Sequence, residues 1–115
     1  MNRHPPVPGS LTISSVLDNG TARISLEGEL DLAGARQMEE RLAEIEGGEP
    51  SRVEVDLGRL AFIDSTGLRL LLQADARARE RGCELVIRPG LPSVQRVFEV
   101  TGALDVLHFE GAPES

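Results

Sequence analysis

Apolar and polar residues alternate in two stretches of the chain, residues 21–27 and 52–57. This alternation predicts β-strands that bury one face and leave the other face in water. Residues 11–16 are predicted to form a further strand, and Asp18-Asn19-Gly20 is typical of a tight hairpin turn. The chain is therefore predicted to begin with an antiparallel hairpin.

Apolar residues at helical spacing predict three α-helices. The first follows the turn at residues 28–31, with Asp31 as its N-cap, and ends at Glu46 before a Gly-Gly-Glu-Pro stretch. The second covers about residues 65–81, and the third lies between Pro92 and Gly102. Residues 83–88 and 105–109 are predicted to form the two remaining strands.

The order of these elements is β-β-α-β-α-β-α-β, which predicts an α/β fold with mostly parallel βα units after the hairpin. Strands covered by helices on both faces are continuously apolar, whereas two of these strands alternate. We therefore expect a mixed β-sheet with its helices mainly on one face. Residues 1–10 are predicted to be a flexible arm, residues 11–110 one domain and residues 111–115 a tail.

Composition narrows the possible functions. The 115 residues carry a net charge of −7, which disfavours binding to nucleic acid, and they include no lysine for phosphate binding or Schiff-base chemistry. Cys83 is the single cysteine, which leaves no disulfide or cysteine metal cluster. No apolar run is long enough for a membrane span. We expect a cytoplasmic protein with no cofactor, no bound metal and no insertion into a membrane.

The stretch Asp64-Ser65-Thr66-Gly67 lies where a strand is followed by a helix, and it has three interpretations. The structural one is an N-cap, a common role for Ser or Asp at this position. A nucleophilic serine would need a neighbouring base, and His4 and His108 are the only histidines. The third is regulatory, because a phosphate on Ser65 would suit the helix N-terminus and would alter any surface that binds there.

The residues around Ser65 resemble the signature of STAS domains, specifically of anti-sigma factor antagonists. The resemblance rests on four segments in order and covers roughly residues 11–109: Gly28–Asp31, Val53–Leu57, Leu60–Leu68, and Ser93–Phe98 followed by Thr101–Leu104. It implies a STAS-type fold and a protein that binds partners without being an enzyme.

The resemblance also implies the partners and the site. With Ser65 unmodified, the protein would capture an anti-sigma factor that is also a serine kinase, and so free a sigma factor for transcription. The kinase would phosphorylate Ser65 and a serine phosphatase would restore it. Asp31 and Asp64 match acidic positions that flank this serine, although both are also plausible N-caps. The partner-binding residues expected from the match are Glu29, Asp31, Asp64, Ser65, Thr66, Gly67, Leu68 and Arg69.

Two features depart from the family pattern. The family fold usually closes with a further C-terminal helix, whereas this chain ends at residues 110–115. Arg69 stands where a small residue is common; it is either a solvated helix charge or a partner for a phosphate on Ser65. Two other functions stay open: a STAS scaffold subunit of a stress-sensing or transport complex without a phosphate cycle, and a small hydrolase that uses Ser65.

Overall fold

The computed structural model describes residues 10–111 of the chain. Four strands form one sheet in the order β1-β2-β3-β4. The strands are β1 (Leu11–Asp18), β2 (Thr21–Leu30), β3 (Arg52–Ile63) and β4 (Glu84–Arg88). The α-helices are α1 (Ala35–Gly47), α2 (Ser65–Glu80) and α3 (Pro92–Thr101), with short 3-10 turns η1 (Leu32–Gly34) and η2 (Ala103–Asp105).

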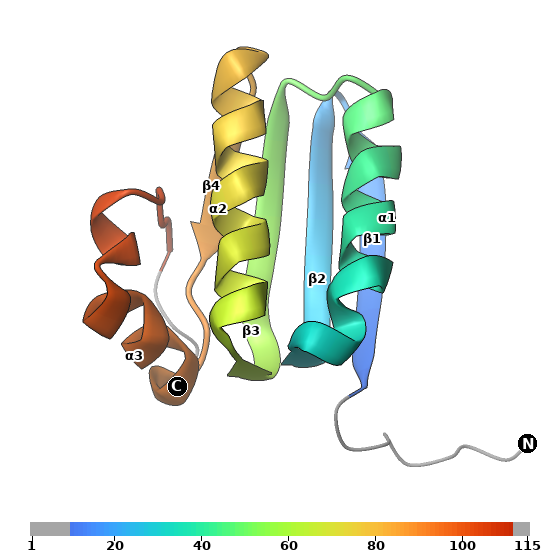
Figure 1. The fold of residues 1–115 in the computed structure, drawn as a ribbon. Helices are drawn as coiled ribbons and strands as arrows, with labels where there is room; N and C mark the ends of the chain where they lie inside the picture. Colours follow the sequence, from blue (N-terminus) through green and yellow to red (C-terminus); the bar gives the residue numbers. More distant parts are fainter. Residues whose placement is uncertain (1–9, 112–115) are drawn as a thin grey trace, which may run out of the picture.

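The sheet is mixed, as the sequence predicts. The β1–β2 pair is antiparallel, and β2–β3 and β3–β4 are parallel. Helices α1 and α2 cover the same face of the sheet, and α3 lies beyond β4 at its edge (Figure 1). The predicted α/β class and the one-sided helix layer are both confirmed.

The core lies between the sheet and this helix layer. The alternating strand residues supply one side of it, and Ile24, Leu26 and Val55 are almost fully buried there. Helix α1 adds Met38, helix α2 adds Leu71, and the other helices and turns complete the same cluster. A single core therefore fixes α1 and α2 across the sheet.

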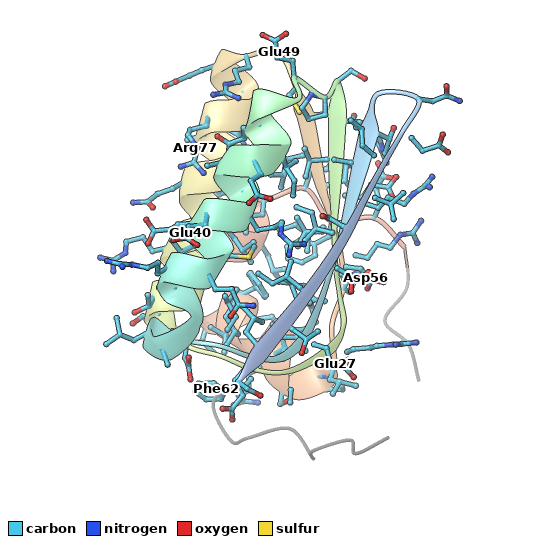
Figure 2. All side chains as sticks on the ribbon, turned by 90° about the vertical axis from the view of Figure 1, so that its right-hand side faces the viewer. Glu27, Glu40, Glu49, Asp56, Phe62 and Arg77 are labelled. Carbon is cyan, nitrogen blue, oxygen red and sulfur yellow. The ribbon has the colours of Figure 1, made fainter. Side chains whose placement is uncertain are left out.

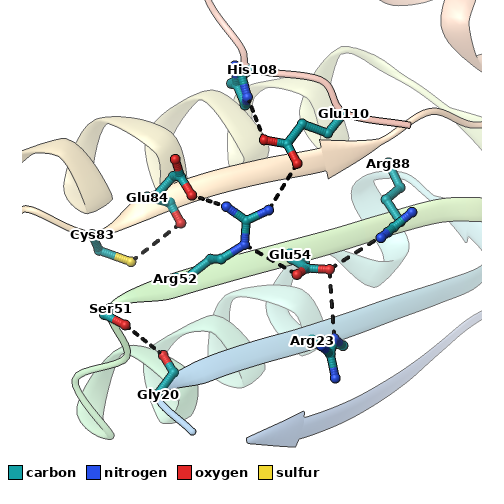
Figure 3. A network of polar contacts seen from close by, with 10 residues as sticks. All are labelled: Gly20, Arg23, Ser51, Arg52, Glu54, Cys83, Glu84, Arg88, His108 and Glu110. Atoms are coloured by element: carbon teal, nitrogen blue, oxygen red, sulfur yellow. Dashed lines mark hydrogen bonds and ion pairs between the residues drawn. The ribbon is translucent and has the colours of Figure 1, made fainter. Parts of the chain in front are cut away.

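The opposite face of the sheet carries a network of ion pairs instead of helices (Figure 3). Arg52 pairs with Glu54, Glu84 and Glu110, and Glu54 also lies 3.7 Å from both Arg23 and Arg88. The hydrogen bond to Glu54 is the main reason why the pKa of Arg52 is raised. These charges explain why the two strands alternate, since their polar positions face water.

The strand predicted over residues 105–109 is wrong. Residues 103–107 fold back on themselves instead, with the amide N–H groups of Val106 and Leu107 donating to the carbonyl oxygen of Ala103. The chain then meets β4 at a single parallel bridge between Phe109 and Ile87, in which the Ile87 amide donates to the His108 carbonyl oxygen and the Glu110 amide donates to the Ile87 carbonyl oxygen. The chain leaves α3 through a left-handed Gly102 (φ 80°) into this turn, and the turn takes up residues 105–107 of the predicted strand.

The remaining expectations differ in detail. β3 runs six residues past the predicted end at Leu57 and reaches Ile63. Residues 1–9 of the predicted arm and 112–115 of the predicted tail lie outside the described residues, whereas the carbonyl oxygen of Ser10 already accepts a hydrogen bond from Glu29. Within residues 10–111, no helix combines the length and apolar composition that a membrane crossing needs.

Candidate functional site

Two aspartates lie side by side at the carboxyl ends of two neighbouring parallel strands. Leu30 ends β2 and Ile63 ends β3, and these two residues are paired in the sheet. The next residues, Asp31 and Asp64, therefore leave the sheet at the same edge, and the Asp64 amide donates to the Leu30 carbonyl oxygen at 3.2 Å. The topology thus brings together two acidic residues that are 33 positions apart in the sequence.

Each of these aspartates caps the element that follows it. The Asp31 carboxylate accepts a hydrogen bond from the Gly34 amide at 3.2 Å, at the start of η1. The Asp64 carboxylate accepts one from the Gly67 amide at 3.0 Å, at the start of α2. The N-cap interpretation is therefore correct for Asp64, whereas Asp31 caps the 3-10 turn η1 and α1 itself begins after Gly34 without a side-chain cap. Capping does not remove the charge of either aspartate from the surface, because both side chains are only half-buried.

Gly67 allows α2 to start very close to the sheet. A Cβ atom at this position would lie 2.5 Å from the Leu30 carbonyl oxygen and 2.9 Å from Cγ1 of Ile63. These distances are too short for any side chain. Leu68, next to it, is buried in the core with 7% of its surface exposed. Residues 64–68, together with Asp31, are called the corner below. Gly67 and Leu68 fix the position of this corner and present little surface to a partner.

Ser65 is the first residue of α2, and its side chain is exposed. Its amide and that of Thr66 precede the first intrahelical hydrogen bond, which runs from the Leu68 amide to the Asp64 carbonyl oxygen. The positive end of the helix dipole and these free N–H groups favour an anion at this point. Arg69 lies one turn further along α2, is exposed, and takes part in none of the ion pairs found within residues 10–111.

Apolar side chains surround this acidic corner. Leu32, directly after Asp31, is 73% exposed, and Phe62, two residues before Asp64, is 47% exposed. Phe62 lies at the end of the sheet where β2 and β3 terminate (Figure 2), and it is paired there with the half-buried Glu29 of β2. Sequence reasoning included Phe62 in the signature but did not select it as a contact residue, and it did not select Leu32.

The pairing between β2 and β3 is irregular in the residues before Phe62. The register shifts twice, because β3 has one more residue than β2 between Asp56 and Arg59, and one more between Leu60 and Phe62. The Asp56 carboxylate supports the first shift by accepting from the Gly58 amide at 2.8 Å. Such bulges change which face a strand residue points to. The two shifts cancel, however, because Val53, Val55, Leu57 and Ile63 are all buried, and Phe62 therefore falls at the same alternate positions as Arg52, Glu54 and Asp56. Extending the alternation of residues 52–57 to the end of β3 would have placed Phe62 on the open face of the sheet.

The hydrolase interpretation finds no support in this geometry. His108 is the only histidine among the described residues, and its Nε2 pairs with Glu110 at 2.9 Å on the far side of β4. No arrangement of a serine with a neighbouring histidine base is present at the Ser65 corner within residues 10–111. The exposed hydroxyl, the helix N-terminus and the apolar surroundings are instead typical of a surface that binds another protein.

Comparison with known proteins shows the family. The family described as "Mlab, STAS domain" matches residues 11–108. The chain belongs to this STAS-domain family. This membership confirms the resemblance found in the sequence, and the corner at Ser65 lies well inside the matched region.

Two curated relatives are named as anti-sigma factor antagonists. BtrV of Bordetella bronchiseptica, provisionally named an anti-sigma factor antagonist, is 38% identical over 91 residues, which is 78% of each chain. The anti-sigma-B factor antagonist of Listeria monocytogenes is 31% identical over 87 residues, 76% of each chain. Among solved structures, an anti-sigma factor antagonist from Mycobacterium paratuberculosis superimposes with a TM-score of 0.79 at 24% identity, covering 92% of this chain and 90% of that one. The last comparison supports the fold.

Proposed function

We propose that this STAS domain is an anti-sigma factor antagonist whose binding is switched by phosphorylation of Ser65. The observation that carries the proposal is the exposed Ser65 hydroxyl at the free N-terminus of α2, beside the carboxylates of Asp64 and Asp31. The two relatives at 38% and 31% identity, which are named as antagonists, support the same function.

In the unmodified state, the corner binds an anti-sigma factor that is also a serine kinase. Its surface combines the exposed apolar side chains of Leu32 and Phe62 with the half-buried carboxylates of Glu29, Asp31 and Asp64. Apolar side chains supply the buried centre of such an interface, and the acidic groups select a partner with a basic rim. Capture of the anti-sigma factor releases a sigma factor, which places the protein in the cytoplasm, where transcription takes place.

Phosphorylation of Ser65 weakens this binding through charge. The phosphate adds close to two negative charges to a corner that already holds Asp31 and Asp64. The free N–H groups of α2, and Arg69 one turn away, stabilise the phosphate within the fold, so the corner keeps its structure. The partner, however, must then bury a dianion against its own surface, which is costly without a matching cation. A serine phosphatase reverses the change.

The test uses a cognate anti-sigma kinase with ATP, followed by intact mass measurement and a binding titration. We expect one phosphate on the unmodified chain and none on Ser65→Ala. Ser93→Ala is the matched control, because Ser93 is also exposed in the first turn of a helix, α3; this variant should still gain the phosphate. The phosphorylated chain should bind about a hundredfold more weakly, a difference of roughly 2.7 kcal/mol.

Other results would change the assignment. A stable complex with the kinase that gains no phosphate would favour a scaffold subunit instead. A phosphate on Thr66, or equal affinity of the modified and unmodified chains, would contradict the switch at Ser65. Failure to bind any anti-sigma factor would contradict the proposed function as a whole.

A further inference from the structure

A cavity of about 610 Å³ lies between the last turns of α1 and α2 and the sheet. Both helices end at the same edge of the sheet, at the top of Figure 1. Small-molecule sites in proteins have volumes of roughly 300–1,000 Å³, so the cavity is large enough for one. Ala78 lines it and is 13 residues from Ser65 along α2, which corresponds to about 20 Å. The cavity is therefore separate from the corner.

The cavity exists because α2 lines it with small side chains. Ala74 and Ala78 are both buried, and neither side chain extends beyond Cβ. Leu42 of α1 and Val53 and Leu85 of the sheet line the same space. Water in such an apolar space finds few hydrogen-bonding partners, so binding of an apolar molecule in its place is favourable.

Three charged residues also line the cavity: Glu46, Glu49 and Arg81. Arg77 donates to both oxygen atoms of the Glu46 carboxylate at 2.9 Å. Arg81 Nη1 donates to the Glu46 carbonyl oxygen at 3.1 Å, and its Nη2 lies 3.8 Å from the carboxylate. Glu49 is exposed and takes part in none of the ion pairs found among residues 10–111. A ligand can therefore reach the charge of Glu49 without breaking an existing pair.

The local field favours a cation over an anion. The two arginines balance the two glutamates in number, and the C-terminal ends of α1 and α2 add negative partial charge at this edge. The chain as a whole carries a net charge of −7, which attracts cations. A carboxylate ligand would instead have to compete with Glu46 for Arg81. The expected ligand therefore carries a positive charge.

We propose that the cavity binds a small apolar amine. Its apolar body lies between the alanines of α2 and the sheet, and its ammonium group remains beside Glu49, in contact with water. This placement buries apolar surface but leaves the charge in solvent, where no desolvation penalty arises. The inference does not depend on the proposed function of Ser65.

The experiment is a fluorescence titration of the full chain with naphthylethylamine. The chain contains no tryptophan and no tyrosine, so the naphthalene signal is measured without interference. A probe of about 13 non-hydrogen atoms should bind with a dissociation constant on the order of 0.1 mM. Naphthylethanol, which lacks the charge, should bind about threefold more weakly, since an exposed ion pair contributes little. Naphthylacetate should bind more weakly still, because Glu49 repels its carboxylate.

Two substitutions test the two parts of the site. Ala74→Leu fills part of the cavity and should weaken binding of the amine by at least about tenfold. Its matched control is Ala76→Leu, at an exposed position of the same helix, which should bind as the unmodified chain does. Glu49→Gln should remove the preference for the amine over the alcohol. Glu40→Gln makes the same change in net charge at an exposed position outside the cavity, so it should keep that preference.

Cys83 provides a second measurement that needs no substitution. It lines the cavity and is the single cysteine of the chain. At about ten times its dissociation constant, the amine should slow the reaction of Cys83 with a chromogenic disulfide reagent about tenfold, because the bound molecule covers the thiol. This measurement tests the site even if Ala74→Leu does not fold.

Three results would overturn the proposal. The amine could fail to bind, or could bind equally well to a folded Ala74→Leu variant. Naphthylacetate could bind as tightly as the amine, which would indicate an anion site at Arg81 instead. The bound amine could also leave Cys83 as reactive as before, which would place it on a different surface of the protein.

Discussion

Substitution of Gly67 by alanine should destabilise the protein, although helix propensity alone predicts the opposite. Alanine is favoured over glycine within a helix by up to about 1 kcal/mol. In this fold, however, the new Cβ atom would lie 2.5 Å from the Leu30 carbonyl oxygen and 2.7 Å from Leu30 Cγ. That carbonyl cannot easily move, because it accepts the hydrogen bond from the Asp64 amide that joins the ends of β2 and β3.

Relief of this overlap requires α2 to move away from the sheet. Overpacking of this kind costs about 1–3 kcal/mol, and contact with backbone places Gly67→Ala toward the upper end of that range. A loss of about 2 kcal/mol in the free energy of unfolding corresponds to a fall of roughly 10 °C in the thermal midpoint for a domain of this size. The displacement would also shift Ser65, so binding at the corner should weaken together with stability.

The assay is urea unfolding followed by circular dichroism, with Gly47→Ala as the matched control. Gly47 is the last residue of α1, and a Cβ atom there would meet nothing within 4 Å. The control should be neutral or up to about 1 kcal/mol more stable. A Gly67→Ala variant as stable as the unmodified chain would refute the reasoning, because it would show that the corner can relax around a side chain.

Two further predictions concern titrating groups. Burial raises the pKa of the Cys83 thiol, so alkylation should be slower in the folded chain than in denaturant at the same pH; equal rates would contradict this. The pKa of Glu110 is lowered mainly by its hydrogen bond with His108. The ionised carboxylate therefore stabilises the folded chain above the pKa of an unfolded glutamate, about 4.3. This stabilisation is lost as the pH falls through the lower pKa that Glu110 has in the folded chain. When the pH is lowered below about 4.5, the thermal midpoint of the Glu110→Gln variant should therefore fall by less than that of the unmodified chain. An identical fall in both proteins would rule out this contribution of Glu110.

The sequence by itself determined the order of the elements as far as α3 and the one-sided arrangement of the helices on the sheet. Alternation at residues 21–27 and 52–57 required that one face of the sheet be exposed to water. The structure confirms this, because the ion pairs around Arg52 and Glu54 lie on the face that no helix covers. The caps Asp31 and Asp64 could also be inferred from sequence, because capping depends on contacts within three residues. Interactions this local can be predicted from the types of neighbouring residues in the sequence.

Only the tertiary structure decided how the corner is built. The parallel pairing of β2 with β3 places Asp31 beside Asp64, and it pairs the exposed Phe62 with Glu29 close to them. Tertiary contacts also restricted Gly67 to glycine and limited the predicted last strand to a bridge at Phe109. These features depend on contacts between residues that are 22 to 37 positions apart in the sequence, such as Ile87 with Phe109 and Leu30 with Gly67. Such contacts contribute to stability only once the distant segments have come together. The pattern of neighbouring residues in one sequence does not show which distant residues will come into contact.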